Sequence, residues 1–424
     1  MQTQTTNTII IGAGQAGLAI SRCLSELGRD HLVLERGRVA ERWHSERWDS
    51  LRLLTPNWMT RLPGFRYDGP DPDGFMRATE VAAFFDRYAA SFDAPVRDNV
   101  TVLRVHQAGA HFVVTTDVGF FEADNVVIAT GWCDRPAVPA MARQLHGDVH
   151  QLVPAAYRNP RQLPDGGVLV VGASATGVQL ADEMAAAGHD VTVAVGNHTR
   201  APRRYRGMDI FWWLDLIGAF DRTVDDAIVD VDAARREPSL QLVGRPDGRS
   251  LDLTTLQRAG VRLAGHLVGI DGTSGTFAPD LSDTVRDADR QMGSLLDRID
   301  RAVEAFGLTR EVLEPAPVRR VVTAAAPEAL DLGAEGIRTV VWAGGYRRSY
   351  DWLDLPILDR RGEIRQHRGV TDVPGVYVLG MRFQHHRDSN FIDGVGRDAR
   401  HVADLIARSP QPLRRPPVPQ HTTK

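Results

Sequence analysis

The stretch that decides the fold is residues 8–35, which read TIIIGAGQAGLAISRCLSELGRDHLVLE. An apolar run at 8–11 predicts a buried strand, and apolar residues at helical spacing over 15–27 predict a helix that ends at Gly28. A second apolar run at 31–34 predicts another strand. Together these segments form one βαβ unit.

The turn inside this unit reads GAGQAG and matches the G-x-G-x-x-G pattern of dinucleotide-binding turns. Its first glycine permits a tight turn, its second lets a pyrophosphate approach the backbone, and its third lets helix and strand pack closely. Glu35 ends the second strand, where a carboxylate accepts hydrogen bonds from a ribose. The residues expected to hold this dinucleotide are Gly12, Gly14, Gln15, Ala16, Gly17, Glu35 and Arg36.

A second unit of the same kind follows, with strands predicted at 167–171 and 191–195 and a helix at 178–187. Its turn reads GASATG, so that Ser174 replaces the middle glycine and slightly crowds a pyrophosphate. The turn residues expected to hold the second dinucleotide are Gly172, Ser174, Ala175, Thr176 and Gly177.

The second unit lacks an acid at the end of its last strand, and arginines follow instead at 200, 203, 204 and 206. Arginine pairs with a ribose 2′-phosphate that an acid would repel, so this pattern favours NADPH over NADH. The expected phosphate ligands are Arg200, Arg203 and Arg204; solvated surface charge is the alternative interpretation.

The fold class expected from two such units is α/β, with two Rossmann-like domains, the second inserted into the first. Further strands are predicted at 112–116, 125–130, 339–346 and 375–380, and helices at 288–306 and 395–407. We therefore predict a first dinucleotide-binding domain over 1–160 and 327–408, an NADPH-binding domain with a helical insertion over 161–326, and a disordered Pro-rich tail over 409–424.

Composition is that of an ordinary globular chain, with 424 residues, 43% hydrophobic, 25% charged and a net charge of −4. No basic excess indicates nucleic acid, and no apolar run reaches the length of a membrane span. Cys23 and Cys133 give neither a disulfide framework nor metal-ligand spacing, which fits a cytoplasmic location. A homodimer is left open.

Two further clusters stand out. The segment 41–56 is rich in aromatic residues and arginine and is expected either to cover a flavin or to form a packed connector.

The segment 381–396 is predicted to form a polar loop followed by the start of a helix, whose N-terminus is expected to face the flavin or a substrate. Because adjacent His385 and His386 cannot both face one metal from a helix and no acid partner is evident, no metal site is expected. The additional residues expected to contact cofactor are Trp43, Arg52, Leu53, Thr130, Gly131, Gly380 and Phe391.

The ordered set of these motifs resembles the class B flavin-dependent monooxygenases, in particular their bacterial flavin-containing-monooxygenase-like members. The resemblance spans residues 7–407 and is weakest in the middle. Besides the two glycine turns and Glu35, it is carried by ATGW at 129–132, RWDSLRL at 47–53, YRNP at 157–160 and FIDGVG at 391–396.

The resemblance implies FAD in the first domain, NADPH in the second, and a C4a-hydroperoxyflavin that transfers one oxygen atom from dioxygen to nitrogen, sulfur or a carbonyl carbon of a small substrate. No catalytic side chain is required. Side chains expected near the flavin are Trp48, Asn57, His385 and His386, and Trp58, Trp212 and Trp213 are further candidates for the substrate wall.

The chain departs from the family pattern at two positions. In the signature F-x-G-x-x-x-H-x-x-x-Y/F, counting from Gly147 places Gln151 where histidine is expected, and counting back from Tyr157 places Val153 there. Leu54 stands where many members carry asparagine. An oxidase or dehydrogenase without a stable oxygenated flavin is therefore the alternative function. A disulfide reductase would need a redox cysteine pair, and a non-enzymatic flavoprotein used for sensing would not be reduced by NADPH.

Overall fold

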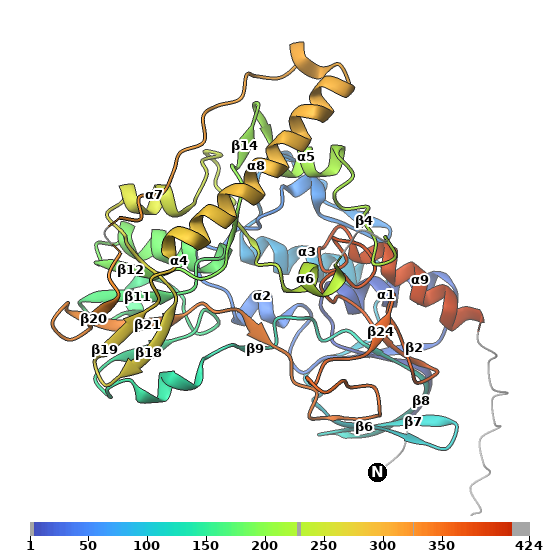
Figure 1. Ribbon diagram of the computed structural model, residues 1–424. Coiled ribbons are helices and arrows are strands. Elements are labelled where there is room, and N and C mark those ends of the chain that lie inside the picture. The colour runs from blue at the N-terminus through green and yellow to red at the C-terminus, as the bar shows by residue number, and fades with distance from the viewer. Residues whose placement is uncertain (1–3, 227–229, 325, 409–424) are drawn as a thin grey trace, which may run out of the picture.

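The computed structural model describes residues 4–226, 230–324 and 326–408. They form two α/β units, each built around its own sheet, and helix α8 runs diagonally across the top of the molecule (Figure 1). The α/β class with two Rossmann-like units is confirmed, and the tail predicted as disordered lies outside the described residues. The α-helices in the described ranges are α1 Gln15–Glu26, α2 Glu41–Ser45, α3 Ala78–Ala90, α4 Ala175–Ala186, α5 Ile210–Leu216, α6 Val231–Arg236, α7 Leu253–Arg258, α8 Leu281–Ala305 and α9 Val395–Arg408.

The larger sheet belongs to the first unit and has ten strands. Its parallel centre runs in the order β26-β8-β1-β2-β5, while β7 and β6 continue from β8 as antiparallel strands. Helices α1 and α9 pack on one another beside this sheet (Figure 1). The strands are β1 Gln4–Ile11, β2 His31–Leu34, β5 Val96–Arg97, β6 Val102–Ala108, β7 His111–Thr116, β8 Gly119–Ile128, β23 Leu353–Asp354, β24 Gln366–His367, β25 Val370–Thr371 and β26 Val376–Val378.

The second sheet has five parallel strands in the order β10-β21-β11-β12-β17. They are β10 His150–Leu152, β21 Ile337–Trp342, β11 Gly167–Val171, β12 Val191–Ala194 and β17 Arg262–Ala264. Since β10 and β21 lie outside 161–326, the inserted unit is wider than predicted. An apolar strand followed by glycine is compatible with a central position in either sheet. The sequence of β21 therefore did not show to which of the two sheets this strand belongs.

Shorter ladders complete the described part. A three-stranded antiparallel sheet extends the second unit, and β9 pairs with β22 where the chain crosses between the units (Figure 1). These strands are β3 Arg61–Leu62, β4 Phe65–Arg66, β9 Arg135–Pro136, β13 Thr199–Arg200, β14 Arg204–Tyr205, β15 Met208–Asp209, β16 Leu240–Gln241, β18 Leu267–Asp271, β19 Ser274–Phe277, β20 Ala329–Asp331 and β22 Tyr346–Arg347.

The two predicted βαβ units are confirmed as β1-α1-β2 and β11-α4-β12. Strand β1 begins at Gln4 rather than residue 8, because the first half of β8 pairs with its polar start. Helix α8 likewise begins at Leu281, seven residues before the predicted 288. One face of α8 is buried. The apolar residues of this face recur at helical spacing and are Leu281, Val285, Ala288, Met292, Leu296, Ile299 and Val303.

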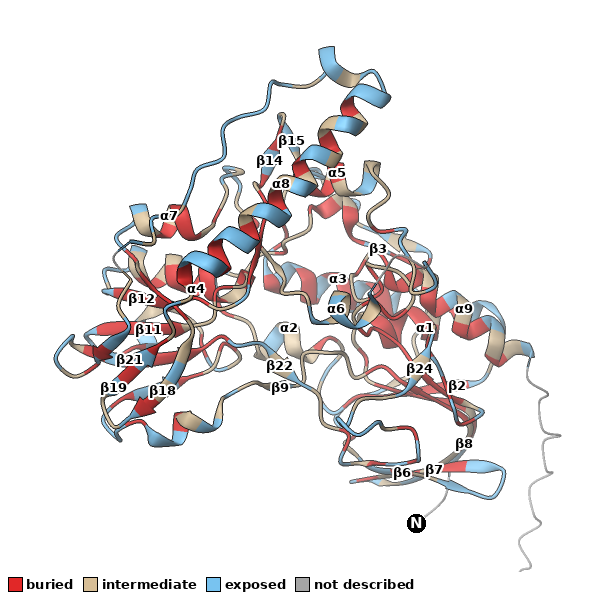
Figure 2. Cartoon of the chain, viewed as in Figure 1, coloured by how far each residue is buried: buried red, intermediate tan, exposed pale blue. Residues whose placement is uncertain are grey.

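Figure 2 shows that the buried residues follow the sheets and the inner faces of α1, α3, α4 and α9, while the outer face of α8 is exposed. Across the described residues, no helix combines the length and apolar composition required to span a bilayer.

Candidate active site

A cavity of about 1480 Å³ lies between the two units and is the main concave feature of the described chain. It begins at the first glycine turn, passes the loop 51–55 and continues beneath α5 and α8. Because Thr284 and Arg298 of α8 both line it, this end follows the helix for about 21 Å at 1.5 Å per residue. A cavity of this shape accommodates an extended cofactor and a second molecule.

The first glycine turn has the geometry that a dinucleotide requires. Gly12 has φ +105°, and a Cβ there would lie 2.7 Å from the carbonyl oxygen of Ala129. A Cβ at Gly17 would lie 1.8 Å from the oxygen of Gly12, so both positions exclude side chains by packing. A Cβ at Gly14 would meet no protein atom within 4 Å, and Gly14 lines the cavity. This free space at the N-terminus of α1 fits the pyrophosphate of FAD.

Glu35 lies where the ribose of that dinucleotide is expected. Its carboxylate accepts hydrogen bonds from the backbone N–H groups of Ala13 (2.7 Å) and Gly37 (3.0 Å), which fix it against the turn. The predicted FAD-site residues that line the cavity are Gly12, Gly14, Gln15, Ala16, Glu35, Arg36, Trp43, Arg52, Leu53, Thr130, Gly131, Gly380 and Phe391. Gly17 lies behind the turn.

The second glycine turn repeats this geometry closely. Gly172 has φ +115°, its Cβ would lie 2.5 Å from the oxygen of Ala343, and a Cβ at Gly177 would lie 1.9 Å from the oxygen of Gly172. Ser174 is the N-cap of α4, and its side chain makes no capping hydrogen bond. The five predicted residues of this turn do not line the main cavity, and they form a separate helix N-terminus on the second unit.

The predicted phosphate arginines lie in different surroundings. Arg200 is buried between Asp289 (3.2 Å) and Asp252 (3.6 Å). Arg203 is buried too; it donates to Asp209 (2.8 Å) and to the carbonyl oxygen of Leu54 (2.6 Å). Both guanidinium groups pair with carboxylates of the protein; Arg200 nevertheless lines the main cavity, whereas Arg203 does not. Arg204 is exposed on β14.

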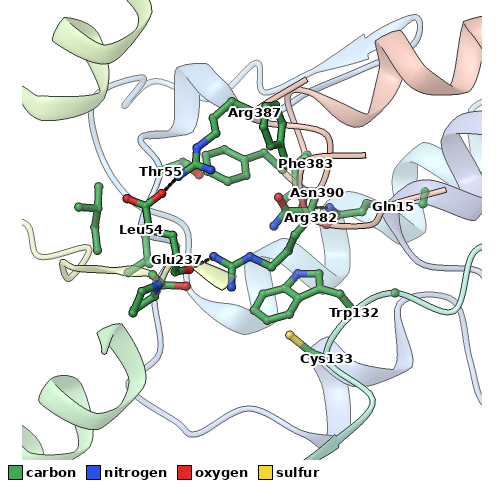
Figure 3. A pocket seen from close by; sticks show the side chains of 18 of the residues that line it. Gln15, Leu54, Thr55, Trp132, Cys133, Glu237, Arg382, Phe383, Arg387 and Asn390 are labelled. Carbon is green, nitrogen blue, oxygen red and sulfur yellow. Dashed lines mark hydrogen bonds and ion pairs between the residues drawn. The ribbon is translucent and has the colours of Figure 1, made fainter. Parts of the chain in front are cut away.

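A polar bridge crosses the cavity between the units (Figure 3). Glu237 of the second unit forms an ion pair with Arg387, and its backbone carbonyl accepts from Arg382. The guanidinium of Arg382 also lies 5.0 Å from the ring centroid of Trp132. Burial lowers the pKa of both arginines, but each keeps its charge because the ordinary value is so high. The bridge therefore joins the two units across the cavity.

The two cysteines lie in different places. Cys133 lines the cavity beside Trp132 (Figure 3), whereas Cys23 lies on α1 and is buried in the core that α1 shares with α9. Burial raises the pKa of Cys133 to about 11 and that of Cys23 to about 12, so both remain protonated thiols at neutral pH. The cavity thus contains a single, unreactive thiol rather than a redox pair.

Four side chains predicted near the flavin do not line the cavity. Trp48 is packed in the core of the second unit, which corresponds to the alternative of a packed connector. Asn57 is buried and bonds the carbonyl oxygen of Asp71 (2.8 Å) and the N–H of Met76 (2.8 Å). His385 and His386 face away from the cavity, toward α9. An aromatic or polar side chain near a cofactor motif can serve packing instead, and local sequence does not distinguish the two.

The remaining tryptophan candidates are also structural. Trp213 is fully buried and donates to the carbonyl oxygen of Tyr205 (2.7 Å), and neither Trp58 nor Trp212 lines the cavity. Of the two family positions, Gln151 lies on β10, where it accepts from Trp342 (3.0 Å), and it does not line the cavity. Leu54 does line it.

Apart from Phe391, the sequence did not indicate the residues at the far end of the cavity. Three rings, Phe211, Phe220 and Phe391, contact one another there with centroids 5.8–6.4 Å apart. Arg222 and Arg298 also line this end, and neither forms an ion pair with any described residue. Burial, and then the charges of Arg222 and Arg301, lower the pKa of Arg298. Except for Phe391, these residues lie on an insertion without a motif, so only the tertiary structure brings them together.

Comparison with known proteins agrees with this architecture. Residues 9–208 match the family model described as pyridine nucleotide-disulphide oxidoreductase. An oxidoreductase from Geobacillus kaustophilus, named "uncharacterized oxidoreductase CzcO-like", is 28% identical over 94% of this chain and 98% of its own length. The probable indole-3-pyruvate monooxygenase YUCCA1 of Arabidopsis thaliana is 30% identical over 48% of this chain and 50% of its own length.

Among solved structures, a flavin-containing monooxygenase from Stenotrophomonas maltophilia covers 95% of this chain and 98% of its own, with a TM-score of 0.65 and 18% identity. This likeness shows the shared fold. With the two glycine turns, the fit of the first to FAD and the relatives above, it identifies an oxidoreductase whose cofactors are FAD and NADPH. The chain is an FAD-dependent oxidoreductase that is similar to the class B flavin-dependent monooxygenases, the group of the flavin-containing monooxygenases.

Proposed function

We propose that this chain is an NADPH-dependent monooxygenase that oxygenates a small organic substrate at the far end of the main cavity. The observation that carries the proposal is the continuity of one cavity from the first glycine turn to the chamber under α5 and α8. Overall, NADPH, a proton, dioxygen and substrate give NADP⁺, water and the oxygenated product. The reaction would take place in the cytoplasm, where NADPH is available.

FAD, when bound, supplies the redox chemistry with dioxygen, and the protein's task is to orient and enclose it. The free space at Gly14 and the carboxylate of Glu35 would hold its pyrophosphate and ribose. The bridge of Glu237 with Arg382 and Arg387 would keep bulk water from the reacting centre.

The second candidate is an oxidase that releases hydrogen peroxide. The observation that favours it is Leu54, which lies in the cavity at the position where many family members carry asparagine. Disulfide reduction is disfavoured, because Cys133 has no cysteine partner at the cavity.

The function is tested by mixing the purified holoenzyme with NADPH, and separately with NADH, without oxygen and following the visible absorption of the flavin. We expect rapid bleaching with NADPH, and, after oxygen is admitted, one oxygenated product per NADPH in the presence of substrate. Peroxide in amounts equal to NADPH with every substrate would establish the oxidase. Absence of bleaching by either nucleotide would contradict the NADPH assignment.

We further propose that the substrate is an organic anion with an apolar body. The three phenylalanine rings give the chamber an apolar wall, and Arg222 and Arg298 supply unpaired positive charge beside it. Arg298 lies nine residues beyond Asp289, the partner of Arg200, or about 13 Å farther along α8. Arg298 therefore lies away from the end of β12, where the 2′-phosphate of NADPH is expected, and its charge is available to a substrate. YUCCA1, by its name, acts on indole-3-pyruvate, which is also an aromatic carboxylate.

The substitution Arg298→Gln tests the charge. With (phenylthio)acetic acid as probe, we expect the KM to rise by about 10–100-fold, because a charge-assisted contact of about 1.5–3 kcal/mol is lost. The KM for the corresponding primary amide should change by no more than about twofold, because the neutral amide makes no ion pair with Arg298 that the substitution could remove. Arg301→Gln, one turn along the same helix and exposed, is the matched control. Equal responses of acid and amide would contradict an anion subsite while leaving the monooxygenase assignment untouched.

A further inference from the structure

Asp398, in the first turn of α9, is a carboxylate enclosed by protein. Its side chain is fully buried, and no hydrogen bond from a described residue reaches either oxygen within normal geometry, although the Ser389 hydroxyl lies close by. A carboxylate removed from water without a charged partner is costly unless a cation or a proton accompanies it. This position therefore calls for a partner that the described residues do not supply.

Two histidines complete the cluster. Nδ1 of His385 lies 3.7 Å from an oxygen of Asp398, and Nδ1 of His386 is buried without a hydrogen-bond partner. The two imidazole rings lie on the same side of the chain, with centroids 4.0 Å apart. One donor atom from each of the three residues lies within 4.8 Å of the others. The expectation that these histidines have no acid partner is thus wrong, because the loop 381–394 folds back onto the start of α9.

The positively charged side chains near this cluster are already paired with other carboxylates. Arg368, the nearest guanidinium to His385, is bound by Asp225 (2.7 Å), and His367 pairs with the same carboxylate (3.2 Å). Arg397, beside His386, is shared between Asp388 and Asp221. On α9, His401 lies with its ring 6.1 Å from that of His385. Each of these arginines is therefore paired with a carboxylate other than Asp398, and neither guanidinium competes with a cation for the oxygens of Asp398.

We propose that His385, His386 and Asp398 form a binding site for one divalent transition-metal ion, with zinc as the best-fitting ion. Two imidazole nitrogens and one carboxylate oxygen are a donor set that zinc accepts, with a water molecule in the fourth position. Zinc–ligand bonds of about 2.0–2.1 Å place ligand atoms about 3.3 Å apart, so binding draws the loop toward α9 by about an ångström.

The site would brace one wall of the main cavity. The same loop that carries the histidines also presents Arg382, Arg387 and Asn390 to the cavity. Gln15, at the first glycine turn, donates to the carbonyl oxygen of Asn390 (2.7 Å) and so ties this loop to the FAD site. A metal at the cluster would fix the loop from its outer side, and it takes no part in the redox reaction.

The test uses the FAD-loaded full chain, freed of any affinity tag, treated with a chelator and titrated with Zn²⁺ against a chromogenic competitor. We expect one zinc per chain, confirmed by elemental analysis, and a rise in Tm upon zinc addition. Asp398→Asn, His385→Gln and His386→Gln should each weaken zinc binding at least about 100-fold, in keeping with the loss of one of three protein ligands.

His367→Gln is the matched control, since this exposed histidine lies close by but outside the cluster. It should bind zinc like the unchanged protein. Flavin content of each variant reports whether it has folded, and agreement between the two histidine variants keeps the test valid if Asp398→Asn does not fold. Binding of less than one zinc per chain, or equal weakening in the control, would overturn the proposal.

Discussion

Gly14→Val is expected to abolish retention of FAD while leaving the fold intact. Gly14 is the N-cap of α1 with φ −83°, a conformation that any residue adopts, and a Cβ there meets no protein atom within 4 Å. The isopropyl group would therefore extend into the cavity, where the pyrophosphate must approach the backbone. We expect the affinity for FAD to fall at least about 100-fold, or about 2.7 kcal/mol.

The measurement is the ratio of flavin to protein absorption after purification, followed by titration of the flavin-free protein with FAD. Gly147→Val is the matched control, because Gly147 is exposed, has the same open space around its Cβ and does not line the cavity. Its flavin content should equal that of the unchanged chain. Normal flavin content in Gly14→Val would place the cofactor elsewhere, whereas loss of flavin in both variants would indicate a general effect on folding.

The local part of this architecture could be predicted because glycine spacing reports backbone geometry directly. Gly12 and Gly172 have nearly the same φ, +105° and +115°, and both would clash with the carbonyl oxygen of a neighbouring strand end if they carried a Cβ. The close approaches of Gly17 to the oxygen of Gly12 and of Gly177 to the oxygen of Gly172 act within one βαβ unit, so the sequence of that unit contains them. The same argument explains why the fold class followed from the sequence and why most of the residues predicted around the first turn lie together at the cavity.

Contacts between distant segments could not be predicted in this way. The carboxylates that bind Arg200 lie at Asp252 and Asp289, on other elements, and nothing near residue 200 indicates them. An arginine of a local cluster can therefore be structural, although its sequence neighbourhood suggests a phosphate. Likewise, Asp398 becomes the partner of His385 only because α9 starts beside the loop. The chamber residues Phe220 and Arg298 come together only through the docking of α8.

Ser174→Asp is expected to remove most of the NADPH-dependent flavin reduction without loss of FAD or stability. Ser174 is the N-cap of α4 and makes no capping hydrogen bond, and aspartate is an equally good or better residue at an N-cap. The added carboxylate would lie at the helix N-terminus where the pyrophosphate of NADPH is expected to bind. At about 4 Å and an effective dielectric constant of about 20, the repulsion amounts to about 4 kcal/mol, so the Kd for NADPH should rise by at least about 100-fold.

The check is the rate of anaerobic flavin reduction as a function of NADPH concentration, measured beside flavin content and Tm. Ser174→Asn is the neutral control of the same size, and it should reduce the rate by no more than about threefold, since asparagine caps a helix as well as serine does. If both variants reduced the rate equally, size rather than charge would be responsible, and the pyrophosphate would not lie at this turn. The two glycine turns are therefore tested by different kinds of substitution. At the first turn, a side chain fills a space that the protein leaves free; at the second, a negative charge is placed where the pyrophosphate is expected to bind.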